Sequence, residues 1–387
     1  RPRRGQAAQP GKIRHGRVST PYRIPFVDLG PQYREVQEDV EAAALRVLRS
    51  GWYVLGPEVE AFESAFAKAC GVEFCVGTSS GTSALQIALA AHGIGPGDEV
   101  ITTPFTFIAT AESIRAVGAT PVFADADATT WNLDPAKAEA AITTRTKAIL
   151  PVHLHGRPAD LSAFESICAK HGLLLIEDAA QAHLARSGDR ICGSVGHSAC
   201  FSFYPAKNLG ACGEGGAVVT NDPTVARRLR MLREFGSERR YVNELAHGTN
   251  ARLESLQAAI LAAKLPHLAS WTEQRRKLAS RYRELLSGLA LTLPAPEGAD
   301  THVWHVFAVM VADRERVQAE LARCGIQTSA HYPIALHLQT SLASLGYKSG
   351  DFPMAERLSR EVLSLPLYLG LTDEMQSEVA QGLSACL

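Results

Sequence analysis

The feature that most constrains this sequence is an alternation, from about residue 40 to residue 220, between short apolar runs and segments of helical periodicity. The apolar runs cover residues 74–78, 99–104, 120–127, 148–156, 173–176, 199–205 and 216–221, and the helical segments cover 82–93, 107–118 and 160–172. Such alternation is typical of βαβ units around a mainly parallel sheet. We therefore predict an α/β fold with a large mixed sheet that is buried on both faces.

The character of the chain changes after residue 250. Residues 251–289 are strongly helical with an interruption at Pro266, and a strand candidate (305–312) and a helix candidate (314–325) follow. A chain of 387 residues can hold one large domain and one smaller one. We predict a large domain over 24–265, and a helical connector with a small C-terminal α/β domain over 266–387.

Composition and charge narrow the classes of partner. The chain has 46% hydrophobic residues, 20% charged residues and a net charge of −1, which favours small metabolites over nucleic acid as ligands. Residues 1–23 contain seven Lys or Arg and no acid. We predict a disordered basic tail there, with a nucleic-acid-binding arm as the alternative.

The cysteines and the length of the apolar runs indicate the cellular compartment in which the protein works. The eight cysteines form no CxxC pair and no metal-ligand spacing, which predicts reduced core thiols and no bound metal. No apolar run reaches the ~18 residues of a membrane span, and the first residues lack the apolar stretch of a signal peptide. We expect a cytoplasmic protein that does not enter a membrane.

The stretch "GTSSGTSAL" (77–85) links a predicted strand to a predicted helix. Small residues such as Gly81 and Thr82 leave backbone N–H groups bare at the positive end of the helix, which favours an anion such as a phosphate. An ordinary helix cap is the alternative, since Ser and Thr are the preferred capping residues.

The stretch "LLLIEDAAQAH" (173–183) ends an apolar strand with two acids, Glu177 and Asp178, followed by Gln181. Ligands of open α/β sheets bind at the carboxyl ends of strands. An acid buried there needs a cation or a hydrogen-bond donor. The alternative is a helix-capping Asp178 with Glu177 turned to solvent.

The stretch "FSFYPAKNLGACGEGGAVVT" (201–220) places Lys207 after another strand and before a glycine-rich segment. A lysine held in an apolar site or near a cation loses basicity, so its neutral amine becomes a nucleophile. A surface lysine before a glycine turn is the alternative. The glycines follow the lysine and lead into a strand, the wrong order for a P-loop or a dinucleotide fingerprint.

A phosphate receptor, a buried acid and an amine nucleophile at one sheet edge together match pyridoxal phosphate. Its aldehyde forms an imine with a lysine, its ring nitrogen stays protonated beside a carboxylate, and its phosphate needs an anchor. Phe107, which follows another predicted strand, is a candidate for a flat wall against the ring; as a lone Phe it could equally belong to the core.

The sequence resembles the sugar aminotransferases of the DegT/DnrJ/EryC/StrS group, which are fold-type I pyridoxal-phosphate enzymes with an aspartate-aminotransferase-like fold. The resemblance runs from "IPFVDLGPQY" (24–33) to "LSLPLYLGLT" (363–372) and includes the three stretches above. Its other strong motifs are "SGWYVLGPEVEAFE" (50–63), "GTNARLESLQAAIL" (248–261) and "DFPMAERLSREVLSLPLY" (351–368).

The resemblance assigns roles to individual residues. It implies that Lys207 forms the imine with the cofactor and moves the proton, that Asp178 pairs with the ring nitrogen, and that Gln181 contacts the ring hydroxyl. Ser202, with Gly81 and Thr82, would hold the phosphate, and Phe107 would stack on the ring. Asn250 would reach the phosphate in the neighbouring subunit, which implies a homodimer with shared active sites.

Two positions depart from the family pattern. Leu184 follows His183 where the family commonly has glycine, and Cys212 occupies the variable place in "GACGEGG". Neither change removes a catalytic group, although Leu184 is expected to alter the wall of the substrate site.

The resemblance implies a transaminase of amino-sugar biosynthesis that uses L-glutamate as donor. The run at 232–265 looks most like enzymes acting on dTDP-3-keto-6-deoxyhexoses, and a 4-keto nucleotide sugar is the alternative substrate. His331 and Tyr332 would contact the sugar, or form a structural turn before Pro333. A dehydratase of the same fold would carry histidine in place of Lys207, and a non-catalytic regulator would not need Lys207, Asp178 and Gln181 together.

Overall fold

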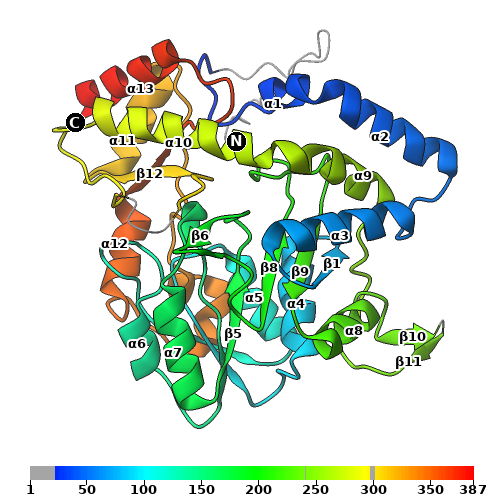
Figure 1. Ribbon diagram of the computed structural model, residues 1–387. Coiled ribbons are helices and arrows are strands. Elements are labelled where there is room, and N and C mark those ends of the chain that lie inside the picture. The colour runs from blue at the N-terminus through cyan, green and yellow to red at the C-terminus, as the bar shows by residue number, and fades with distance from the viewer. Residues whose placement is uncertain (1–21, 240, 297–300) are drawn as a thin grey trace, which may run out of the picture.

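The computed structural model describes residues 22–239, 241–296 and 301–387 (Figure 1). The predicted basic tail lies, apart from its last two residues, outside the described residues. A seven-stranded sheet forms the centre, in the order β1-β9-β8-β5-β4-β2-β3. Its strands are β1 (Phe74–Thr78), β2 (Glu99–Thr102), β3 (Thr120–Phe123), β4 (Thr146–Ile149), β5 (Leu174–Asp178), β8 (Ser198–Ser202) and β9 (Gly216–Thr220).

Six of these strands point the same way. β9 pairs antiparallel with both β1 and β8, whereas every other pair in the sheet is parallel. The prediction of a mainly parallel mixed sheet is therefore confirmed. Because the parallel strands share a direction, the carboxyl ends of β1, β2, β5 and β8 meet at one edge of the sheet.

Helices cover both faces of the sheet, as predicted. On one face, Val218 packs in a cluster with α4 (Gly81–Ala91), α5 (Ile108–Ala116) and α8 (Pro223–Leu232). On the other face, the next residue, Val219, packs with α3 (Pro57–Cys70) and α9 (Ser255–Lys264). Farther along that face lie α6 (Pro135–Ala140) and α7 (Leu161–His171). Alternate side chains of the strands are thus buried on opposite faces.

The helical connector is interrupted at Pro266, as the sequence predicts. α9 ends at Lys264, the 3₁₀ turn η2 (Leu265–His267) contains Pro266, and α10 (Leu268–Leu285) follows. α10 packs with α11 (Arg314–Arg323), α13 (Asp373–Cys386) and the antiparallel pair β12 (Phe307–Met310) and β13 (Val362–Leu365) in a second core. Figure 1 shows α10, α11 and α13 together near the C-terminus.

Residues far apart in the sequence join this second core. Ile24 is fully buried in it and pairs with Ile326. A further cluster joins the large sheet to the C-terminal part, with Phe105 and Phe123 on one side and Val306 and Leu358 on the other. The division at residues 24, 265 and 266 stays a prediction.

The remaining described elements complete the fold. They are α1 (Gly30–Glu35), α2 (Gln37–Ser50), α12 (Pro353–Glu361), the pair β6 (Arg186–Ser187) and β7 (Arg190–Ile191), the pair β10 (Ser237–Arg239) and β11 (Val242–Asn243), and the 3₁₀ turns η1 (Leu154–Gly156), η3 (Leu336–Leu338) and η4 (Thr340–Leu345). The β10–β11 hairpin projects beside α8 (Figure 1).

All eight cysteines are free thiols. Six are buried, but Cys212 and Cys324 are exposed, so the prediction of core thiols is wrong for these two. Within the described part of the chain, no helix combines the length and the apolar character that crossing a bilayer requires.

Candidate active site

A cavity of about 610 Å³ opens at the sheet edge where the carboxyl ends of β1, β2, β5 and β8 meet. The structure brings nearly all of the predicted site residues into its lining: Gly81, Thr82, Phe107, Asp178, Gln181, Ser202, Lys207, His331 and Tyr332. Asn250 is the exception. It is exposed, it does not line the cavity, and its side-chain oxygen accepts a hydrogen bond from Arg252 Nε at 3.0 Å.

The start of α4 supplies donors to one end of the cavity. Ser80 caps the helix in a reciprocal pair with Ser83, so the helix-cap interpretation is correct for Ser80. A Cβ on Gly81 would lie 2.7 Å from Ser202 Cβ, so only glycine lets the helix start approach Ser202 this closely. The first N–H groups of a helix lack intrahelical acceptors, and here Gly81 and Thr82 line the same cavity as Ser202.

The two acids at the end of β5 have different surroundings. Asp178 accepts from Thr110 Oγ1 at 2.8 Å and from the Ala180 N–H at 3.2 Å. Burial raises the pKa of Asp178, against the effect of these hydrogen bonds. Glu177 is fully buried and faces away from solvent, because it accepts from the N–H groups of Gly193 and Gly196. The interpretation that Glu177 faces solvent is therefore wrong.

Glu177 also lies within metal-binding distance of His153 and Cys192. His153 Nδ1 accepts from the Ala159 N–H at 3.0 Å, so its Nε2 carries the proton that it donates to Glu177 at 2.9 Å. Both ring nitrogens and both carboxylate oxygens are therefore engaged in hydrogen bonds. The three residues form a structural network rather than a candidate metal centre.

Lys207 is half-buried in the wall of the cavity, so it is not an ordinary surface lysine. Its backbone N–H donates to Tyr204 O at 2.8 Å, and its Nζ lies 3.5 Å from His305 Nε2. No carboxylate of the described residues forms an ion pair with it. Burial lowers the pKa of Lys207 to about 8, with the charge of Asp178 opposing the shift. The amine is thus partly neutral near physiological pH.

The glycines after Lys207 are required for close approach. A Cβ on Gly210 would lie 2.2 Å from Pro205 O, and one on Gly216 would lie 2.3 Å from Ser80 O. Both positions have negative φ angles, so conformational freedom is not the reason for glycine there. Gly216 holds the end of the Lys207 loop against the start of α4.

Gln181 and Tyr332 are joined above the end of β5. The Gln181 amide donates to Tyr332 Oη at 3.0 Å and accepts from the His155 N–H at 2.5 Å. The ring of Phe107 lies 5.7 Å from the ring of Tyr332, and Phe107 is 53% exposed. Phe107 therefore belongs to the cavity wall and not to the core.

His331 Nδ1 lies 2.9 Å from Ser364 Oγ, and its carbonyl accepts from His155 Nε2 at 3.1 Å. Burial lowers the pKa of His331 to about 4, and that of His155 and His183 to about 3. The histidines around Lys207 are neutral at physiological pH.

Leu184 has a φ of +60°, in the left-handed region that favours glycine. Its side chain packs against the core beneath α3 and does not line the cavity. The expectation that Leu184 alters the substrate wall is therefore not supported: the backbone conformation is the physical reason for glycine at this position.

Several polar residues of the cavity lining were not predicted from the sequence, among them His305, Arg275, Thr110 and Glu214. His305 lies in a predicted strand and Arg275 within a long helical run, so neither stood beside a strand end. Both reach the cavity only because α10 and the segment before β12 pack across the sheet edge.

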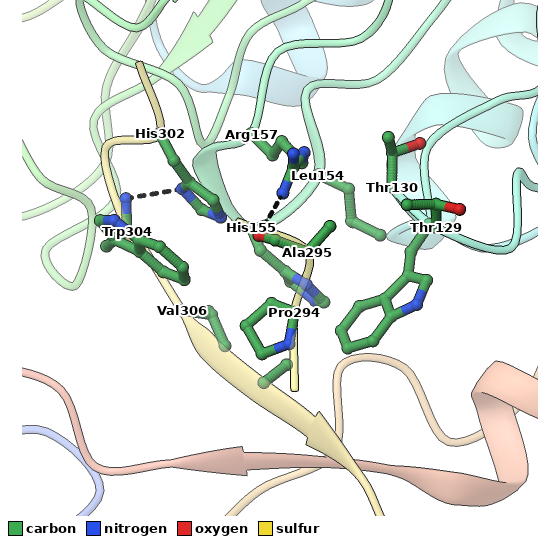
Figure 2. A pocket seen from close by; sticks show the side chains of 12 residues that line it. Thr129, Thr130, Leu154, His155, Arg157, Pro294, Ala295, His302, Trp304 and Val306 are labelled. Carbon is green, nitrogen blue, oxygen red and sulfur yellow. Dashed lines mark hydrogen bonds between the residues drawn. The ribbon is translucent and has the colours of Figure 1, made fainter. Parts of the chain in front are cut away.

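A second, far smaller pocket of about 10 Å³ lies between His155, Arg157 and His302 (Figure 2). In Figure 2 Arg157 points to the Ala295 carbonyl, at 2.9 Å, and the Trp304 N–H donates to His302 Nδ1. A space of this size is at the lower limit for a single water molecule.

The large cavity fits pyridoxal phosphate. A buried amine of lowered pKa, a buried carboxylate and a helix start that only Gly81 allows are the three groups that this cofactor needs.

A family model described as the DegT/DnrJ/EryC1/StrS aminotransferase family matches residues 34–384. The dTDP-3-amino-3,4,6-trideoxy-alpha-D-glucose transaminase of Streptomyces venezuelae is 48% identical over 352 residues, which cover 91% of this chain and 92% of that protein. The erythromycin biosynthesis sensory transduction protein EryC1 of Saccharopolyspora erythraea is 48% identical over 363 residues, which cover 94% of this chain and 99% of that protein.

Among solved structures, S. venezuelae DesV in complex with a ketimine intermediate is similar with a TM-score of 0.91 and 46% identity, covering 95% of this chain and 98% of that chain. The predicted fold-type I architecture is confirmed, and pyridoxal phosphate is the cofactor that this fold and these residues take. The chain belongs to the DegT/DnrJ/EryC1/StrS aminotransferase family.

Proposed function

We propose that this aminotransferase moves the amino group of L-glutamate to the keto carbon of a nucleotide-linked sugar, with a dTDP-3-keto-6-deoxyhexose as the sugar. The name of the S. venezuelae relative, a dTDP-3-amino sugar transaminase, supports the substrate class. The observation that carries the proposal is the convergence of Lys207, Asp178 and the start of α4 on one cavity.

The roles of the residues follow from the chemistry of their positions. Bound pyridoxal phosphate supplies an aldehyde that reacts with amines and a protonated ring that draws electrons from the carbon beside the nitrogen. Lys207 Nζ, of lowered pKa, would take the proton from the donor carbon and return it on the cofactor side, and would act in the opposite direction with the sugar. Asp178 would keep the ring nitrogen protonated.

Other residues position the reactants. Thr110 fixes the Asp178 carboxylate through its hydroxyl. Ser202 and the N–H groups of Gly81 and Thr82 would hold the phosphate, and Phe107, which also lines the cavity, would stack on the ring. Gln181 is held by His155 and Tyr332 and would contact the ring hydroxyl of the cofactor. Tyr332 and His331 line the part of the cavity left for the sugar.

The alternative functions differ in the residues that they require at the site. A 4-keto nucleotide sugar would use the same residues, and only an assay separates it from the 3-keto sugar. The dehydratase branch would carry histidine where Lys207 stands. The regulatory name of the S. erythraea relative fits a regulator, yet a regulator gains nothing from a buried lysine, a buried acid and a helix start facing one cavity.

The test begins with purified protein loaded with pyridoxal phosphate. It should be yellow, borohydride should fix the cofactor at Lys207, and L-glutamate should bleach the colour. Lys207→Ala is the negative variant, and Lys170→Ala, at the exposed end of α7, is the matched control. A panel of 3-keto and 4-keto nucleotide sugars then identifies the carbon that is aminated. A colourless protein with no response to pyridoxal phosphate would refute the proposal.

We further propose a homodimer in which Asn250 of each chain completes the phosphate site of the other. Exposed aromatic side chains support this proposal, because Trp52, Tyr53 and Phe235 each expose half or more of their surface. A cytoplasmic location stays a prediction from the free thiols.

A further inference from the structure

Arg275 is a buried cation in the wall of the cavity. It lies on α10, is 5% exposed, and lines the cavity beside His305 and Leu367. No carboxylate of the described residues lies within ion-pair distance of it. A buried charge without a counter-ion is costly, so a group that brings a negative charge into the cavity would gain from meeting it.

Backbone carbonyls hold Arg275 in place. Its Nη1 donates to the carbonyls of Trp304 at 3.1 Å, Leu367 at 3.2 Å and His305 at 3.5 Å. Its Nε and Nη2 donate to no described residue. Burial lowers the pKa of Arg275 to about 10, so the guanidinium is charged at physiological pH and keeps free donors.

The other charged residues of the cavity are not available to bind the negative charge of a substrate. Lys207 binds the cofactor, and Asp178 meets its ring nitrogen. Glu214, which also lines the cavity, has the wrong sign for an anionic ligand and is exposed. Arg275 is the remaining cation among the described residues of the lining.

We propose that Arg275 binds the carboxylate group next to the amine of the amino-acid donor. This inference rests on the proposed function. It names the residue that distinguishes an amino acid from a simple amine in the first half of the reaction.

Distance favours the donor carboxylate over the phosphates of a nucleotide sugar. A single residue, His305, separates Arg275 from the reacting amine: its ring lies 3.5 Å from Lys207 Nζ, and its carbonyl accepts from Arg275. The carboxylate of an amino acid is one bond from the carbon that carries the amine. The diphosphate of a 3-keto nucleotide sugar is attached through an oxygen to C1, so its nearer phosphorus is several bonds from the keto carbon.

The experiment measures binding to the cofactor-loaded protein by the change in its visible absorbance. Wild type, Arg275→Met and Arg275→Lys are titrated with L-glutamate and with n-butylamine, which has no carboxylate. Arg157→Met is the matched control, because Arg157 also binds backbone carbonyls, those of Ala295 and Pro296, but lies outside the large cavity.

We expect Arg275→Met to weaken L-glutamate binding roughly 10- to 150-fold, the effect of losing a hydrogen bond to a charged group. Affinity for n-butylamine and the amount of bound cofactor should not change. Arg275→Lys keeps the charge but loses the planar guanidinium, so its affinity for L-glutamate should lie between those of wild type and Arg275→Met. Arg157→Met should match wild type with both ligands.

A second readout does not depend on the cofactor chemistry. Glutarate, which lacks the amine, should bind the wild type in calorimetry and bind both Arg275 variants more weakly. Equal weakening for L-glutamate and n-butylamine would mean that Arg275 only supports the fold, and loss of bound cofactor would mean that it serves the phosphate; either result overturns the inference. If L-glutamate does not change the absorbance of the wild-type protein, the proposed function is refuted instead. If Arg275→Met does not fold, Arg275→Lys and the glutarate titration decide.

Discussion

At the scale of single residues, the reactivity of Lys207 follows from where its amine is buried. Burial lowers its pKa from 10.5 to about 8. The neutral amine is the reactive form, and it accumulates as the pH rises through the pKa. We therefore expect the rate at which cofactor-free protein captures pyridoxal phosphate to rise with pH and to reach half its maximum at about pH 8.

Stopped-flow absorbance over a pH series measures this rate. Lys207→Ala should show only the slow, nonspecific reaction of exposed lysines, whose rates rise at a higher pH. A midpoint near that of an exposed lysine would contradict the burial described for Lys207.

Two adjacent acids, Asp178 and Glu177, should respond in opposite ways to loss of charge. Asp178→Asn removes the charge that faces the ring nitrogen, so we expect the half-reaction with L-glutamate to slow by roughly 100- to 1000-fold, the effect of losing one preorganised electrostatic contact. Its stability should change little, since burial already disfavours that charge. Glu177→Gln instead replaces one carboxylate oxygen by an amide NH₂, which then faces either the Gly193 N–H and His153 Nε2 or the N–H groups of Val195 and Gly196.

We expect Glu177→Gln to lower the free energy of unfolding by about 1–3 kcal/mol, because buried donors lose their acceptor. Urea denaturation measures this loss, and single-turnover absorbance measures the half-reaction. A slow half-reaction in Glu177→Gln with full stability, or an unfolded Asp178→Asn, would reverse the assignment of the two acids.

At the scale of secondary-structure elements, α12 is capped from the large sheet. Its own N-cap residue, Phe352, offers no side-chain acceptor. Asp125, just after β3, accepts from the N–H groups of Met354 at 2.9 Å and Ala355 at 2.8 Å. A carboxylate at a helix start satisfies donors and complements the helix dipole. This contact joins the large sheet to the C-terminal part.

We expect Asp125→Ala to lower the free energy of unfolding by about 2 kcal/mol, the upper end for a lost helix cap, because the site is buried. Asp134→Ala, which removes a local cap from exposed α6, should cost about 0.5–1 kcal/mol. Urea denaturation of both variants makes the comparison. Equal losses would show that the contact with α12 adds nothing beyond local capping.

The sequence predicted the elements whose pattern is local. The strands at 74–78 and 216–221 and the break at Pro266 agree with β1, β9 and η2 to within a residue or two. Lys207, Asp178 and Gly81 could be predicted to lie together because each follows a strand, and parallel strands end at one edge. The opposite direction of β9 could not be predicted from its composition.

Contacts between distant segments were not predictable either. The cap from Asp125 to α12 spans more than two hundred residues, and Ile24 finds its place only beside Ile326. His305 and Arg275 carry no turn, glycine or strand-end signal, and they reach the cavity through packing across the sheet edge. Tertiary packing decides such placements.

At the scale of the whole molecule, the cavity lies where the large sheet meets the C-terminal part. Asn250 lies outside the cavity of its own chain, and its segment is bound to the base of the β10–β11 hairpin by the bridge between Glu234 and Asn250. The proposed homodimer would place this segment at the cavity of the other subunit.

Subunit mixing tests shared sites directly. Lys207→Ala removes the amine, and Asn250→Asp sets a like charge against the cofactor phosphate, so we expect each variant alone to be inactive or nearly so. If the two residues act in the same chain, mixtures of the variants stay inactive. If Asn250 acts across the interface, a mixed dimer holds one site with both residues intact and one with neither.

Random exchange of subunits in an equal mixture makes half of the dimers mixed, so about a quarter of all sites should regain activity, as expected for a two-fold symmetric pair. Sedimentation must first show dimers, and exchange is promoted by mild denaturant and dilution. A mixture of Lys207→Ala with the exposed-site variant Lys170→Ala is the control. Its activity shows how far inactive subunits lower the activity when no site depends on mixing. Recovery in the first mixture requires that Asn250 of one subunit acts in the cavity of the other. No recovery from mixed dimers would mean that Asn250 does not act across the interface, and full activity of Asn250→Asp alone would place Asn250 outside the site.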